Sequence, residues 1–146
     1  MKKSLVLFLF IFGLNSKKAE AQIGVSYFPI QSIVALNSDS EKMLWADLRM
    51  ETNTFIANIN FELNGFYNFK RKDNINYYIG LGINVNPFYS LEGLSATNGY
   101  LIPVGCRIKP FPRIRNVQLA FEISPYLNPD FEGGQIRSLL GLAYNF

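Results

Sequence analysis

The sequence predicts an all-β fold, a single antiparallel up-and-down transmembrane β-barrel, with eight strands preferred to seven. Five segments in the last two-thirds of the chain alternate apolar and polar residues with the period of two that β-strands have. The apolar phase is bulky, whereas the polar phase holds amides and glycines instead of the Lys, Glu and Thr usual on a water-exposed strand. That inversion is typical of a barrel with lipid outside and a narrow polar lumen inside.

Residues 1–21 are predicted to form a cleaved export signal. A basic start precedes an apolar core at residues 5–14, and residues 19–21 form a small-x-small cleavage site. The core is about ten residues long, whereas a bilayer-spanning helix needs about twenty. Two lysines at residues 17–18 leave an uncleaved membrane anchor as the alternative. Residues 22–146 then form one β-barrel domain.

The start of this domain leaves the strand count open. Residues 23–28 and 31–37 fit either two short strands around Pro29 or one long bent strand. We prefer two, because the resulting even count returns both chain ends to one side of the membrane. Individual strands are expected to run about 10 to 14 residues, and about 9 to 11 tilted residues cross a bilayer.

The remaining strands form a meander separated by turn residues. They are expected at residues 44–51, 55–69, 75–87, 100–109, 117–124 and 136–146. Pro103 removes a ladder hydrogen bond from its strand, so a bulge or break is expected there. With a periplasmic C-terminus, the turns 70–74 and 110–116 are periplasmic and the loops 88–99 and 128–135 lie outside. The connections near Pro29 and at residues 51–54 should be unusually short.

Four acids and four bases fall in the inward phase and are predicted to form a charge network in the lumen. They should pair, because a lone buried charge costs several kcal/mol, and an eight-stranded barrel is only wide enough to be filled by side chains. The residues are Asp47, Arg49, Glu51, Glu62, Arg107, Lys109, Glu122 and Arg137. We interpret them as a structural plug. The alternatives are a proton or solute path, or a glycosidase-like carboxylate pair at Glu62 and Glu122.

The sequence offers little catalytic chemistry. It contains no histidine, which excludes Ser-His and Asp-His mechanisms and any Cys/His metal cluster. The single Cys106 lies in the apolar phase, where a free thiol behaves as a small hydrophobe. We therefore expect no enzyme activity, no catalytic residue, no metal site and no cofactor.

The charge balance gives no support to a nucleic-acid partner. Four of the 14 basic and one of the 11 acidic residues lie in the signal, which leaves 10 of each in a formally neutral domain. A basic turn is expected to contact anionic headgroups or a periplasmic partner, through Lys70, Arg71 and Lys72. The longest outer loop carries apolar residues that either mark a contact surface or join an aromatic girdle, namely Phe88, Tyr89, Leu91 and Leu94.

A soluble barrel is the main alternative fold assignment. A lipocalin-like barrel that binds an apolar ligand also alternates, with its apolar face inward. Its outer face would then consist largely of Asn, Gly and Ala, few of which favour strands. The apolar phase also carries Tyr and Phe towards strand ends, as interfacial girdles do. These features favour the membrane barrel.

The signal, the meander and a last strand of alternating apolar residues together resemble a bacterial outer-membrane β-barrel. Leu140, Leu142, Tyr144 and the terminal Phe146 match the pattern that the barrel-assembly machinery reads in that family. The resemblance covers essentially the whole mature chain as a pattern, and the Ile, Asn, Lys and Phe bias is similar to proteins of Bacteroidota.

This resemblance implies the outer membrane of a Gram-negative bacterium as the location, after export and signal cleavage. Outer-membrane lipid and the assembly machinery are the implied partners, together with other envelope proteins. The resemblance implies very little about the activity of the protein. We expect a structural or accessory subunit of a cell-envelope complex, with a soluble periplasmic ligand-binding barrel or a narrow pore as the alternatives.

Overall fold

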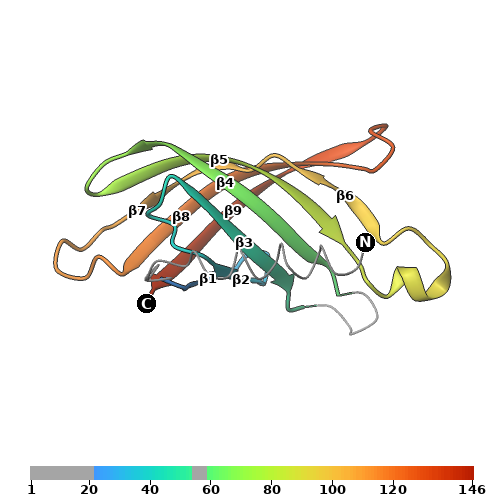
Figure 1. The fold of residues 1–146 in the computed structure, drawn as a ribbon, viewed down its shortest axis with the longest axis horizontal. Coiled ribbons are helices and arrows are strands. Elements are labelled where there is room, and N and C mark those ends of the chain that lie inside the picture. The colour runs from blue at the N-terminus through green and yellow to red at the C-terminus, as the bar shows by residue number, and fades with distance from the viewer. Residues whose placement is uncertain (1–21, 54–58) are drawn as a thin grey trace, which may run out of the picture.

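The described part of the chain folds into one antiparallel sheet that closes on itself (Figure 1). The structure is a computed structural model that describes residues 22–53 and 59–146, so the expected signal at residues 1–21 lies outside the described residues. The strands are β1 (Gly24–Phe28), β2 (Ile33–Asn37), β3 (Leu44–Glu51), β4 (Phe61–Arg71), β5 (Ile75–Val85), β6 (Thr97–Leu101), β7 (Val104–Ile108), β8 (Val117–Leu127) and β9 (Gly134–Asn145). Within these residues no helix has the length and apolar character needed to cross a membrane.

These nine strands build a wall of eight. β6 and β7 are two halves of one wall strand, since both pair with β5 on one side and with β8 on the other. They are separated at Pro103, which has no N–H; its carbonyl accepts from Gly80 N at 2.7 Å, and Ile102 N donates to Pro125 O at 3.0 Å. The predicted break and the preferred count of eight are both confirmed.

Every wall strand pairs with its neighbour in sequence, and the meander is closed by β1 and β9. Val25 lies opposite Tyr144 in that closing pair, and Phe146 N donates to Ile23 O at 2.9 Å just beyond it. The predicted all-β, antiparallel up-and-down barrel is therefore confirmed.

Strand lengths depart from the expected 10 to 14 residues on one side of the barrel. β4, β5, β8 and β9 have 11 or 12 residues, but β1 and β2 have five each and β3 has eight. Pro29 ends β1, because it cannot continue a ladder, and Ser32 at φ 52° completes the tight turn into β2. β4 starts at Phe61, so residues 59 and 60, which were expected in this strand, lie outside it; residues 54–58 of the expected strand lie outside the described part.

The inward phase packs aromatic rings over glycines. Phe66 lies over Gly80, where an added Cβ would come within 2.5 Å of the ring, and Phe28 lies over Gly141, where the corresponding distance is 2.6 Å. The glycines of the polar phase thus make room for rings from neighbouring strands. These rings, with small residues such as Ala35 and Ala120, fill the lumen around the charged side chains.

The outward phase is apolar all around the barrel. Between the strand ends it carries no charged side chain, and each of the eight wall strands contributes a large exposed apolar residue, for example Tyr27, Leu36, Leu44, Leu63, Leu81, Val104, Ile123 and Leu142. The C-terminal end of the barrel has the connections 38–43, 72–74 and 109–116; the loop end has 29–32, 52–60, 86–96 and 128–133. The predicted division of turns and loops between two ends is therefore correct.

Candidate functional site

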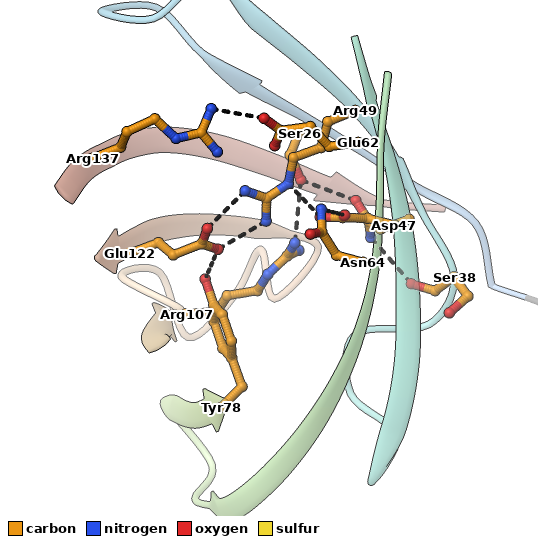
Figure 2. A network of polar contacts seen from close by, with 11 residues as sticks. Ser26, Ser38, Asp47, Arg49, Glu62, Asn64, Tyr78, Arg107, Glu122 and Arg137 are labelled. Atoms are coloured by element: carbon orange, nitrogen blue, oxygen red, sulfur yellow. Dashed lines mark hydrogen bonds and ion pairs between the residues drawn. The ribbon is translucent and has the colours of Figure 1, made fainter. Parts of the chain in front are cut away.

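The centre of the lumen is organised by Arg49 on β3 (Figure 2). Its Nη1 and Nη2 donate to Glu122 Oε1 and Oε2 on β8, at 2.7 and 2.8 Å, in a two-pronged pair. Its Nε donates to Asp47 Oδ2 at 2.9 Å. All three side chains are at most 1% exposed, so this charge-assisted geometry replaces the water that each group loses on burial.

Neutral side chains complete the hydrogen bonds of both acids. Tyr78 on β5 donates its hydroxyl to Glu122 Oε2 at 2.9 Å, and Asn64 Nδ2 on β4 donates to Asp47 Oδ1 at 2.8 Å. The central group therefore joins four wall strands, β3, β4, β5 and β8, across the lumen (Figure 2).

Arg107 on β7 lies in the same layer without a carboxylate partner among the described residues. Its guanidinium carbon lies 4.5 Å from the centre of the Trp45 ring, and its Nη2 donates to Ser26 Oγ at 3.4 Å. Its Nε and Nη1 have no hydrogen-bond partner within the described part of the chain. The two acids of the central group carry one more charge than its arginine, so Arg107 brings the layer to neutrality while stacking on an aromatic face.

Two further ion pairs flank this layer. Towards the loop end, Arg137 Nη1 donates to Glu62 Oε1 at 2.7 Å, and Asn84 Nδ2 donates to the same oxygen at 3.2 Å. At the C-terminal end, Lys109 Nζ pairs with Glu41 Oε2 at 2.5 Å, while Gln118 Nε2 donates to Glu41 Oε1 at 2.7 Å.

The predicted network is thus divided into separate groups. Asp47, Arg49 and Glu122 lie together with Arg107. Glu62 forms a separate pair with Arg137, and Lys109 forms another with Glu41. Glu51, half-buried at the end of β3, makes no ion pair with the described residues. Glu62 and Glu122, weighed as a catalytic carboxylate pair, each bind an arginine.

Sequence reasoning missed several members of these groups. Tyr78, Asn64 and Trp45 lie in the inward phase of their strands, so the alternation alone could have identified them. Glu41 lies in the connection between β2 and β3, where no period applies, and only the tertiary structure brings it to Lys109.

The charged side chains of the lumen are out of contact with bulk solvent. Arg49, Glu62 and Arg107 are each 1% exposed. No group of three or more Cys, Asp or Glu side chains in residues 22–53 and 59–146 is placed to hold a metal ion. The arrangement can therefore brace the wall strands against one another.

The other candidate residues all lie on the surface. Leu140, Leu142, Tyr144 and Phe146 point outward and are 40 to 69% exposed along the seam between β9 and β1. At the loop end, Leu91 and Leu94 are 82 and 59% exposed around a short 3-10 turn, η2 (Tyr89–Glu92), while Phe88 and Tyr89 are half-buried. At the C-terminal end, the basic turn exposes Lys70, Arg71 and Lys72.

Comparisons with protein-family models, with curated proteins and with solved structures found no match to this chain. The residues and their geometry alone therefore carry the functional argument.

Proposed function

We propose that this protein is a non-enzymatic outer-membrane β-barrel that serves as a structural or accessory subunit of a cell-envelope complex. One observation carries the proposal: the apolar outward phase, which is free of charged side chains and continuous over all eight wall strands. In water, so large an apolar surface promotes aggregation, whereas a bilayer requires it. Residues 1–21 would supply the export signal.

The lumen supports a scaffolding role over transport or catalysis. Three arginines and three acids, with the aromatic rings beside them, fill the barrel between its two ends. Each acid is bound to an arginine, so none is free to transfer a proton to a substrate. An ion would have to displace these pairs to cross.

The loop end supports a subunit role over adhesion. Its connections are at most eleven residues long, so little protein projects beyond the wall. Leu91, the most exposed apolar side chain there among the described residues, would suit a contact with another envelope protein.

Heat-modifiable gel migration of the membrane-extracted mature protein tests the membrane assignment. We expect the unboiled protein to migrate differently from the boiled protein and to occur in the detergent-resistant outer-membrane fraction. Soluble periplasmic protein with no shift would favour the alternative, a lipocalin-like barrel with an apolar ligand, with which the eight-stranded fold is equally compatible.

The single thiol supplies a second test without any substitution. Cys106 is half-buried in the outward phase of β7, so a membrane-embedded barrel should protect it from a water-soluble maleimide until the protein is unfolded. Ser90→Cys in a Cys106→Ser background, which places the thiol in the exposed η2 turn, is the control and should react at once. Rapid labelling of Cys106 in the folded protein would contradict the membrane assignment.

A further inference from the structure

The two ends of the barrel carry opposite charge. Of the ten basic and ten acidic side chains after residue 21, three of each lie in the central lumen and cancel. The C-terminal end has seven bases and three acids, a net side-chain charge of +4, and the loop end has four acids and no base, a net charge of −4. The side chains after residue 21, which are formally neutral in sum, are therefore strongly polarised along the barrel axis.

Five of the seven bases make no ion pair within the described part of the chain. Lys109 binds Glu41, and Lys42 lies 3.9 Å from Asp39. The remaining bases lie on two turns and are exposed, namely Lys70, Arg71, Lys72, Arg113 and Arg115. These two turns carry one acid, Asp73, which also makes no ion pair with the described residues.

Hydrogen bonds tie the three connections of this end into one preformed surface. Lys109 N donates to Asn74 O at 2.8 Å and links the two basic turns. Arg71 Nη1 donates to Glu41 O at 3.3 Å and links one of them to the connection 38–43. The backbone of the two basic turns is therefore fixed at one end of the barrel (Figure 1, where the hairpin of β4 and β5 and the connection from β7 to β8 lie at the same end).

Exposed apolar side chains alternate with these bases. Phe111 and Ile114 are each 54% exposed in the turn that carries Arg113 and Arg115. Successive backbone hydrogen bonds within the turn, such as Ile114 N to Phe111 O at 3.1 Å, give its backbone a defined conformation. Hydrophobic residues beside guanidinium groups suit the boundary between hydrocarbon and headgroups.

We propose that the C-terminal end of the barrel binds anionic phospholipid headgroups of the leaflet that faces it. Phe111 and Ile114 enter the acyl boundary, and the five unpaired bases lie at the level of the phosphates. This inference rests on the proposed membrane location. It adds a lipid preference and an orientation, with the acidic loop end directed away from that leaflet.

A lipid surface fits this end better than an acidic protein does. The bases are spread over a rim directly beyond the apolar band, where Phe69 precedes Lys70 along the strand. A folded acidic partner would cover Phe111 and Ile114 only with a matching apolar pocket, whereas a bilayer supplies hydrocarbon at every point of the rim.

Lipid selectivity around the folded barrel tests the proposal. The full mature protein is refolded into phosphatidylcholine vesicles, and spin-labelled phosphatidylglycerol and phosphatidylcholine report the fraction of each lipid immobilised at the barrel. We expect a preference of about threefold for phosphatidylglycerol, weakened at about 1 M salt, where the screening length falls to about 3 Å.

Two variants locate the effect. The first variant should lose the preference for phosphatidylglycerol; it combines Lys70→Gln, Lys72→Gln, Arg113→Gln and Arg115→Gln. Arg71 is left unchanged because it donates to Glu41 O. The matched control neutralises exposed acids of the loop end, with Glu92→Gln, Asp130→Asn and Glu132→Gln, and should keep the preference. Equal immobilisation of both lipids by the wild type, or a preference that survives in the basic-end variant, would overturn the inference.

The heat shift in pure phosphatidylcholine separates the two proposals. A protein that inserts there and shows the shift, but has no lipid preference, refutes the lipid inference and leaves the membrane barrel standing. A protein that inserts in no bilayer refutes the membrane barrel itself.

Discussion

Glu122 is the residue on which the central lumen depends most. It accepts both terminal nitrogens of Arg49 and the hydroxyl of Tyr78, so three wall strands meet at one carboxylate. Loss of its charge would leave Arg49 buried with Asp47 as its remaining anionic partner.

Glu122→Gln is therefore expected to destabilise the barrel by about 3 kcal/mol, the cost of breaking a buried ion pair from one side. The measurement is the free energy of unfolding in urea, followed by fluorescence of the single Trp45, which lies inside the lumen. Glu132→Gln, at an exposed loop acid, should change the free energy by less than about 0.5 kcal/mol. Equal unfolding free energies of the two variants would show that the central lumen does not depend on Glu122.

Two glycines of opposite phase provide a second test at the residue scale. A Cβ at the inward Gly105 would lie 2.7 Å from the Tyr78 hydroxyl and closer still to the backbone oxygen of Phe121. We expect Gly105→Ala to cost about 1 to 3 kcal/mol, because backbone cannot move aside as a flexible side chain can. At the outward Gly65 an added Cβ meets nothing within 4 Å, so Gly65→Ala should change the free energy of unfolding by less than about 0.5 kcal/mol.

At the scale of elements, β9 is both the longest strand and the strand that closes the wall. It pairs with all of β8 and with most of the short β1. Phe146 lies just beyond it, 69% exposed, with its ring 5.0 Å from that of Tyr144. So exposed a ring contributes little to the folded wall, and we expect its main effect on assembly in cells.

Phe146→Ala should lower the amount of heat-modifiable protein in the outer membrane of cells, with little change in the unfolding free energy of purified, refolded protein. Quantitative immunoblots of the membrane fraction give the first readout and urea unfolding the second. Phe131→Ala, a comparably exposed ring at the loop end, is the control and should leave membrane levels unchanged. Normal levels of the Phe146 variant would count against the assembly signal.

At the scale of the whole molecule, the filled lumen predicts a barrel that does not conduct ions. The largest fully buried side chains include Arg49, Arg107 and Tyr78, which lie in one layer between the two ends. Purified protein in a planar bilayer should therefore show no discrete conductance steps, with insertion verified by protection of Cys106. Reproducible steps would contradict the plug and support the narrow-pore alternative.

Prediction from the sequence succeeded where local periodicity decides the structure. The period of two sets the phase of Arg49, Glu122 and Leu142 without reference to any partner strand, because successive side chains point to opposite faces. A missing N–H at Pro103 is likewise a local property, and it placed the break between β6 and β7 correctly. The preference for eight strands over seven came from a different argument, that an even count returns both chain ends to one side of the membrane.

Only the tertiary structure decided which groups meet. Arg49 and Glu122 are 73 residues apart in the chain, and their contact depends on the register of every strand between them and on the curvature of the closed wall. The same holds for the Lys109–Glu41 pair and for the contact of Arg107 with the Trp45 ring. By itself the sequence determined which way each strand residue faces, because that is local geometry. The pairing across the lumen arises only when the sheet closes, because closure brings opposite walls within hydrogen-bonding distance.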